Sequence, residues 1–333
     1  MFVLTSYAAA VLFCVVTMLC WGSWANTQKL AGREWRFELF YWDYALGVFL
    51  LSVVMALTLG SVGESGRSFF ADVAQADFAN IRSAIIGGVV FNIANILLVA
   101  AIAIAGMSVA FPVGIGMALV LGVLVNYWAE PVGDATILFL GVGAVVVAIL
   151  LDAAAYRRLP SSGRGVTAKG LILSVLCGVL MGFFYRFVAE GMSTEFTNLA
   201  PGKLGPYSAV FFFSVGLLLS NFVLNPIIMK KPFAGEPLPL SAYFTGTARV
   251  HLIGILGGAI WGVGMTFNII ASGQAGFAVS YGLGQGATMI AALWGVFIWK
   301  EFRSAPKSTS ALLALMFVFY LAGLAMIIAS RVV

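Results

Sequence analysis

Residues 83–128 read SAIIGGVVFNIANILLVAAIAIAGMSVAFPVGIGMALVLGVLVNYW. The stretch contains two apolar runs, 83–103 and 107–128, with only a short turn near Gly106 between them. Each run has the roughly 20 residues that a helix needs to cross a hydrocarbon core about 30 Å thick. A membrane β-barrel would instead show ~10-residue segments of alternating polarity. The stretch therefore predicts two successive membrane-spanning helices.

The whole chain has the composition of a membrane protein. Hydrophobic residues make up 62% of its 333 residues and charged residues only 9%, and the mean hydropathy is +1.04. Soluble domains carry about 25% charged residues. So few charges cannot cover the surface of a soluble protein of this size, which excludes soluble enzymes, nucleic-acid-binding proteins and disordered regulators.

Ten apolar segments are long enough to cross a membrane, and together they predict an all-α polytopic membrane protein. They are 6–28, 40–59, 83–103, 107–128, 135–156, 170–190, 206–228, 250–271, 276–299 and 310–331.

Lysine and arginine residues mark one side of the predicted bundle. The loops after the first, fifth, seventh and ninth spans carry thirteen of them: Lys29, Arg33, Arg36, Arg157, Arg158, Arg164, Lys169, Lys230, Lys231, Arg249, Lys300, Arg303 and Lys307. The other side carries four: Arg67, Arg82, Lys203 and Arg331. Because cytosolic loops are enriched in Lys and Arg, both termini are predicted to lie outside.

The two halves of the chain are similar to each other. The segment AGMSVAFPVGIG at 105–116 is matched by AGFAVSYGLGQG at 275–286, an offset of 170 residues. Each half has five spans, and five is odd, so the second half must enter the membrane in the opposite direction. We predict two inverted five-helix repeats, 1–156 and 170–333, joined by a cytosolic linker at 157–169.

Histidine and cysteine are too scarce for a metal centre. The chain has one His and three Cys, and the cysteines lie in apolar stretches without CxxC spacing. They are predicted to be neither disulfides nor metal ligands. No metal or other cofactor is expected.

Neutral polar and aromatic side chains recur inside the spans, where an unpartnered polar group costs several kcal/mol. We predict that they line a central substrate cavity: Trp21, Trp24, Asn92, Asn95, Tyr185, Asn268, Tyr281 and Gln285. Amides, hydroxyls and indoles suit a neutral solute such as a sugar or a small heterocycle, which can stack on Trp and hydrogen-bond to Asn and Gln. The alternative for each residue taken singly is a hydrogen bond between helices.

A few carboxyl groups are candidates for proton coupling. Asp43, flanked by aromatic residues in FYWDY at 40–44, is the first candidate, although an Asp at the start of a helix is commonly a cap. Glu130 is the second, but Glu301 occupies the matching repeat position, which favours a structural role for both.

Two further charged residues stand four apart in the sixth span. Arg186 and Glu190 are predicted to shape the local electrostatic field or to neutralise each other. Asp152 lies near the end of the fifth span.

Several stretches resemble a known transporter group. They are WGSWANTQKL at 21–30, FYWDYALGVFLLSVVMALTLGSVG at 40–63, GGAIWGVGMTFNIIASGQ at 257–274 and IWKEF at 298–302. Together with the span count and the repeat, they resemble the drug/metabolite transporter superfamily, in its branch of ureide permeases, glucose/ribose porters and L-rhamnose–proton symporters.

This resemblance implies proton-driven uptake of a small polar metabolite into a cavity between spans 1–4 and 6–9. One departure concerns the middle of the chain. Plant ureide permeases carry a long central loop with a nucleotide-binding-like motif, whereas SSGRG at 161–165 lacks the P-loop pattern. Direct coupling to ATP is not supported.

We therefore expect a non-enzymatic secondary transporter that imports a sugar or a ureide- or nucleobase-like solute by alternating access. Its expected partners are the solute, a coupling proton or another cation, and the lipid bilayer, without nucleic acid. The bacterial cytoplasmic membrane is the expected location. An exporter of drugs or amino acids is the first alternative, and an integral-membrane enzyme is the second. The sequence does not specify the solute or the oligomeric state.

Overall fold

The computed structural model describes residues 1–32, 34–159, 167–233 and 235–332. Arg33 lies outside the described residues, as do residues 160–166 of the predicted linker, which include Arg164. Ten helical spans cross the bundle, as predicted, and the described ranges contain no β-strand, only an isolated bridge between Met192 and Leu204.

The first five spans begin and end within a few residues of the predicted positions. The elements of this half are α1 Tyr7–Ser23, α2 Ala25–Ala31, α3 Phe37–Leu57, α4 Phe69–Gln75, α5 Phe78–Ala105, α6 Met107–Ala110, η1 Phe111–Ile115, α7 Gly116–Ala129 and α8 Ala135–Tyr156. The first span is formed by α1 and α2, which are divided at Trp24. The fourth span starts with the π-helical turn η1, where Pro112 has no amide hydrogen for a regular helix bond.

The second half also has five spans. Its elements are α9 Ala168–Gly191, α10 Pro206–Lys230, η2 Leu240–Thr245, α11 Ala248–Ala275, α12 Phe277–Gly284, α13 Ala287–Leu293, η3 Trp294–Ile298 and α14 Ser308–Ala329. The ninth span is interrupted at Gln285 and Gly286, between α12 and α13. Each half therefore has a broken helix at the centre of the bundle: the first span is divided at Trp24, and the ninth span is divided at Gln285 and Gly286.

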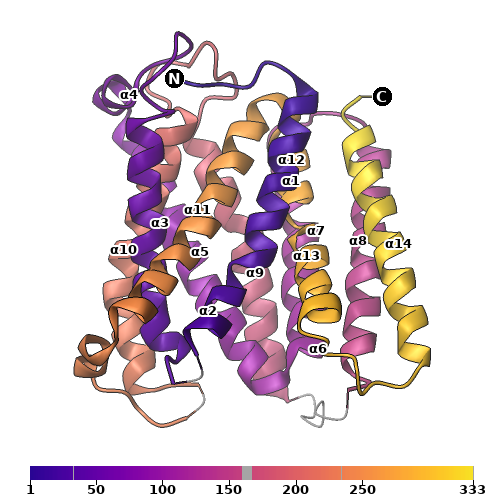
Figure 1. The fold of residues 1–333 in the computed structure, drawn as a ribbon. Helices are drawn as coiled ribbons and strands as arrows, with labels where there is room; N and C mark the ends of the chain where they lie inside the picture. Colours follow the sequence, from indigo (N-terminus) through magenta and orange to yellow (C-terminus); the bar gives the residue numbers. More distant parts are fainter. Residues whose placement is uncertain (33, 160–166, 234, 333) are drawn as a thin grey trace.

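Both chain termini lie at the same end of the bundle, which we call the terminal end (Figure 1). The opposite end, here called the basic end, gathers the described loop residues 34–36, 157–159, 235–247 and 299–307. Arg36 donates to the carbonyl oxygen of Glu236 (2.6 Å), and Arg158 donates to Ser308 Oγ (3.0 Å), so these loops contact one another. The structure thus collects the Lys- and Arg-rich loops on one side, as the prediction of orientation requires.

The helices of the two halves contact each other reciprocally. Helix α5 packs against α9 and α10, and α11 packs against α1 and α3. Gly88 lies against the carbonyl of Phe213 and Gly258 against the carbonyl of Tyr44, where a Cβ on either glycine would overlap the oxygen. Two-fold-related halves would make such paired contacts. The inverted repeat stays a prediction, and these contacts support it.

Helices α8 and α14 stand together at one edge of the bundle (Figure 1). Gly141 and Gly323 face each other's carbonyl groups, which allows the two backbones to approach closely. The remaining helices enclose the centre, where the candidate site lies.

Candidate functional site

A central cavity of about 320 Å³ lies between the halves. It is lined by Trp21, Gly22, Trp24, Ala25, Gln28, Phe91, Asn95, Leu98, Val99, Ile102, Phe111, Ile115, Met181, Phe184, Trp261, Gln285, Ala287, Thr288 and Ala291. The described lining residues include no charged side chain. Its size and mixed apolar and polar lining are those of a small-molecule site.

Aromatic rings form a continuous wall of the cavity. Trp21 stacks on Trp261 with ring centroids 5.6 Å apart, and Phe91 lies 4.4 Å from Trp261. The indole nitrogen of Trp21 donates to the carbonyl oxygen of Trp261 (3.2 Å), which fixes the two rings relative to each other. Such a wall can accommodate the flat face of a ring-shaped solute.

The amides of Asn95 and Gln285 are polar groups of the lining that can bind a solute. Asn95 donates through Nδ2 to the hydroxyl of Tyr41 (3.1 Å), which in turn donates to Asn92 Oδ1 (2.9 Å). This chain of hydrogen bonds holds Asn95 in place and leaves its Oδ1 available. The side-chain amide of Gln285 bonds to none of the described residues, so both its donor and its acceptor are available to a solute.

Four of the eight predicted substrate residues line this cavity: Trp21, Trp24, Asn95 and Gln285. The other four are buried nearby and bond to neighbouring helices. Asn92 donates to Ser220 Oγ (2.9 Å), and Tyr281 donates to the carbonyl of Met181 (3.0 Å). For these two residues, the structure shows the alternative to a place in the cavity lining, namely a hydrogen bond between helices.

The remaining two residues meet at Ser280. The hydroxyl of Tyr185 lies 3.0 Å from Ser280 Oγ, and Asn268 donates through Nδ2 to the Ser280 carbonyl oxygen (2.8 Å). They therefore connect α9 and α11 to α12.

Sequence reasoning missed Trp261, Phe91 and Phe184 as cavity residues. The repeat could have found them, because Trp261 stands 170 residues after Phe91, and Phe184 stands 160 residues after Trp24. Both members of each pair line the cavity. Applied to the aromatic residues, the 170-residue offset between the two halves would have predicted the pairing of Phe91 with Trp261 in this wall.

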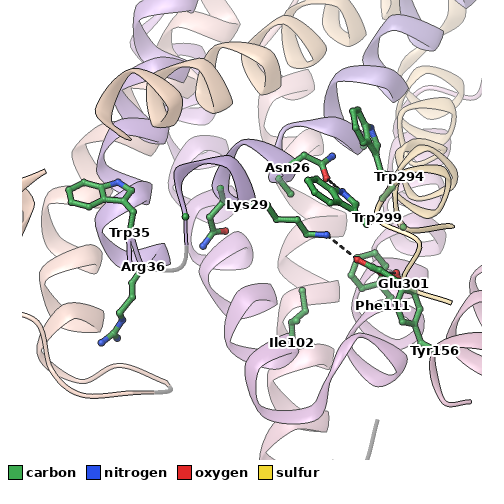
Figure 2. Close-up of a pocket in the computed structure, with 16 residues that line it drawn as sticks. Asn26, Lys29, Trp35, Arg36, Ile102, Phe111, Tyr156, Trp294, Trp299 and Glu301 are labelled. Carbon is green, nitrogen blue, oxygen red and sulfur yellow. Dashed lines mark hydrogen bonds and ion pairs between the residues drawn. The ribbon is translucent and has the colours of Figure 1, made fainter. Parts of the chain in front are cut away.

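The cavity continues into a larger vestibule of about 670 Å³ at the basic end (Figure 2). Gln28, Ile102, Phe111 and Ala291 line both spaces. At the edge of the vestibule, Lys29 forms an ion pair with Glu301 (3.0 Å).

Indole groups connect the two sides of the vestibule. Trp299 Nε1 donates to Asn26 Oδ1 (2.6 Å), and Trp294 Nε1 donates to Ser23 Oγ (2.8 Å). These bonds join the first span to the end of the ninth. The path from the centre of the bundle to the basic end thus runs past a polar and aromatic rim.

Hydrogen bonds and side-chain packing join the loops at the terminal end. The amino group of Met1 donates to the carbonyl of Ser65 (2.6 Å), and Gln274 donates to the carbonyl of Leu4 (3.1 Å). The ring of Phe196 lies against Gly273. Burial lowers the pKa of the Met1 amino group. The connections at this end tie the N-terminus to the second and eighth spans.

Asp43 lies outside the residues that line the central cavity and the vestibule. Its carboxylate, which is 1% exposed, accepts a hydrogen bond from Tyr243 (2.6 Å) and lies 3.0 Å from His251 Nδ1. It thereby connects α3 to η2 and α11. Burial, together with the adjacent Asp43 carboxylate, raises the pKa of the Tyr243 hydroxyl.

Glu130, Arg186 and Glu190 lie toward the terminal end of the bundle. Burial raises the pKa of Glu130, while the positive charges of Arg186 and Arg331 oppose that rise. Arg186 thus acts electrostatically on Glu130. No ion pair joins Arg186 to Glu190 within the part of the chain that the structure describes. The described residues also include no group of three or more His, Cys, Asp or Glu that could hold a metal ion.

Comparison with known proteins identifies the family. The sequence model named "Ureide permease" matches residues 40–163 and 157–330, most of the chain. Ureide permease 4 and ureide permease 1 of Arabidopsis thaliana are each 23% identical, over 99% of this chain and 99% of the relative. The glucose uptake protein GlcU of Bacillus subtilis (strain 168) is 25% identical over 65% of this chain and 68% of its own length.

A solved crystal structure that carries no functional name has a TM-score of 0.61. It covers 98% of this chain and 100% of its own at 18% identity, so the likeness concerns the fold alone. The relatives named above come from a plant and a bacterium, so they do not indicate a particular membrane. The chain belongs to the ureide permease family, which places this integral membrane protein among solute importers.

Proposed function

We propose that this member of the ureide permease family imports a neutral, planar, ureide- or nucleobase-like solute, driven by a proton gradient. The observation that carries the proposal is the pairing of an uncharged aromatic wall with the available amides of Asn95 and Gln285. A charged solute would have no counter-ion among the described lining residues. A planar molecule with both donors and acceptors would stack on the indoles and bond to the amides.

A sugar is the second candidate substrate. Indole rings also stack on sugar rings, and the relative GlcU is named as a glucose uptake protein. The names of the relatives, permease and uptake protein, favour import over the exporter and membrane-enzyme alternatives.

Alternating access between two inverted halves is the proposed mechanism. The central cavity is continuous with the vestibule at the basic end, while hydrogen bonds join the loops at the terminal end. With the basic end in the cytosol, an opening at that end would correspond to the inward-facing state of this mechanism. In the outward-facing state, the terminal end would open and the first and ninth spans would close over the vestibule.

The proposed import is tested with the purified protein in proteoliposomes that carry an imposed pH gradient. Radiolabelled allantoin, uracil, glucose and ribose are offered separately, and allantoin or uracil is expected to accumulate in a saturable way. Accumulation of glucose or ribose alone would show that the substrate is a sugar, the second candidate. No accumulation of any solute, with export of preloaded solute instead, would overturn import.

Coupling through Asp43 or Glu130 is tested in the same vesicles. If either carries the proton, Asp43→Asn or Glu130→Gln abolishes gradient-driven accumulation but leaves solute exchange at equal pH. Unchanged accumulation removes the substituted residue from the coupling mechanism.

A further inference from the structure

Asp152 is a buried carboxyl group that has no role in the transport mechanism proposed above. It lies one turn before the end of α8, and its side chain is 5% exposed. Its Oδ1 is buried and accepts no hydrogen bond from any described residue. An ionised carboxylate in that position would be unfavourable, because burial removes the water around the charge and no donor replaces that water.

A second carboxyl group, Glu301, acts electrostatically on Asp152. Glu301 differs from it in having two donors: Tyr156 donates to Oε2 (2.9 Å), and Lys29 pairs with Oε1 (3.0 Å). Tyr156 stands one helical turn after Asp152 on the same face of α8. In neighbouring carboxyl pairs, the member with a cation and a donor keeps its charge, and the member without them holds the proton.

Few other charges act on Asp152. Helix α8 packs against α14, α6, η1 and α7, and the sequences of these four elements contain no charged residue. The charged group that acts on Asp152 is Glu301, which in turn pairs with Lys29, while Arg157 follows α8 directly. Its uncharged titratable neighbours are Tyr156 and Tyr320. No described cation forms an ion pair with Asp152.

Asp152 lines neither cavity, but its neighbours relate it to both. On one side, Tyr156 and Glu301 line the vestibule (Figure 2). On the other side is Tyr320 of α14, which is fully buried, interacts with Asp152 and lies beside Thr288. Thr288 lines the central cavity. Hydroxyl and carboxyl groups thus stand between the central cavity and the vestibule, and neither the Tyr320 hydroxyl nor Asp152 Oδ1 is engaged by a hydrogen bond to a described residue.

We propose that Asp152 binds the coupling proton of this importer and releases it to vestibule water through Tyr156 and Glu301. The proposal rests on the proposed function, because it assigns a site to the coupling proton. The proton enters with the solute when the terminal end is open, and neutral Asp152 permits the change to the inward-facing state. Release leaves a buried carboxylate near Glu301, and their repulsion favours return to the outward-facing state, where Asp152 is protonated again.

The test compares Asp152→Asn with wild type in proteoliposomes. We expect at least a tenfold loss of pH-gradient-driven accumulation, with exchange of solute at equal pH retained, since Asn mimics the protonated side chain. Asp152→Glu should restore part of the driven uptake. Asp134→Asn is the matched control, because Asp134 caps the other end of the same helix, and Asn is an equally good cap. Wild-type accumulation by Asp152→Asn would overturn the assignment, as would uptake driven by sodium alone.

Infrared titration gives a readout that does not depend on transport. The wild-type protein should show a protonated-carboxyl band that is lost as the pH rises and that is missing in Asp152→Asn. If this band is present but wild-type uptake ignores the pH gradient, the proposed coupling fails while the proton site stands. If the two proteins titrate identically, Asp152 is not the site, whether or not transport is proton-driven. If Asp152→Asn exchanges no solute, the infrared titration still shows whether Asp152 holds the proton.

Discussion

At the scale of single residues, the cavity separates polar groups that hold the protein together from groups that remain available. Asn92 and Asn95 stand three apart on α5, yet Asn92 is fully buried and bonded on both ends of its amide, whereas Asn95 presents its Oδ1 to the cavity. Gln285 lies at the interruption of the ninth span, where its side chain makes no hydrogen bond to the described residues. We therefore expect the available groups to determine which solute binds.

Replacing Gln285 by Leu should weaken solute binding without weakening the fold. The loss of one hydrogen bond to a solute, about 0.5–1.5 kcal/mol, corresponds to a KM increase of roughly 2- to 13-fold. Thermal stability should stay unchanged, because the amide has no protein partner to lose. The control for binding is Asn126→Leu, a buried amide outside the cavity whose Oδ1 lacks a partner. Its Nδ2 donates to the Gly122 carbonyl oxygen (2.8 Å), so this variant should lose stability and keep the wild-type KM. Equal KM values for wild type and Gln285→Leu would remove Gln285 from the binding site.

The sequence predicted which kinds of residue line the cavity, amides and aromatic rings, but only four of the eight named residues line it. Helical spacing shows that Asn92 and Asn95 share one side of a helix, but the hydroxyl of Tyr41, 51 residues before Asn92, bonds to both amides. Only tertiary packing determines that Asn92 also meets Ser220 on α10. The partners of Asp43 could not be predicted from the sequence either, since Tyr243 and His251 lie about 200 residues away along the chain.

At the scale of elements, close helix crossings at glycines hold the two halves together. A Cβ on Gly258 would overlap the carbonyl oxygen of Tyr44 and lie 2.8 Å from Val48 N, both backbone atoms of α3. Backbone atoms cannot move aside as a flexible side chain can. Small residues at such crossings allow the van der Waals packing that stabilises helix association in membranes.

Gly258→Ala should therefore destabilise the protein by about 1–3 kcal/mol, the usual cost of overpacking. The measurement is thermal unfolding in detergent, with Gly143→Ala as the control on α8. A Cβ at Gly143 would meet nothing within 4 Å, so that variant should unfold at the wild-type temperature or slightly higher. Equal unfolding temperatures for the two variants would show that α3 and α11 separate easily, contrary to the contacts described here.

The helices themselves were largely predictable, since apolar length determines a span almost directly. The predicted span 135–156 coincides with α8, and all ten spans are present. The interruptions at Trp24 and at Gln285–Gly286 were not predicted as helix breaks. Glycine and tryptophan are tolerated inside membrane helices, so their presence does not by itself predict a break. In the structure, α1 packs against α12 and α13, the helices on either side of the break in the ninth span.

At the scale of the whole molecule, the structure is open toward the basic end. The vestibule of about 670 Å³ leads to a central cavity about half that size, and the loops that surround it carry most of the chain's positive charge. If the charge distribution sets the orientation, water and solute reach the centre from the cytosol in this state.

The accessibility of a single introduced thiol tests this arrangement. Ala291 lines both the vestibule and the central cavity. In a variant whose Cys14, Cys20 and Cys177 are replaced, Ala291→Cys should react with a charged, membrane-impermeant thiol reagent applied from the cytosolic side. A transported solute should slow the reaction. Val147→Cys, on the outer face of α8, should stay unreactive, because thiols in lipid do not ionise. Reaction of Ala291→Cys only from the outer side, in vesicles of known orientation, would reverse the predicted topology, since the path from Ala291 to water runs through the basic end.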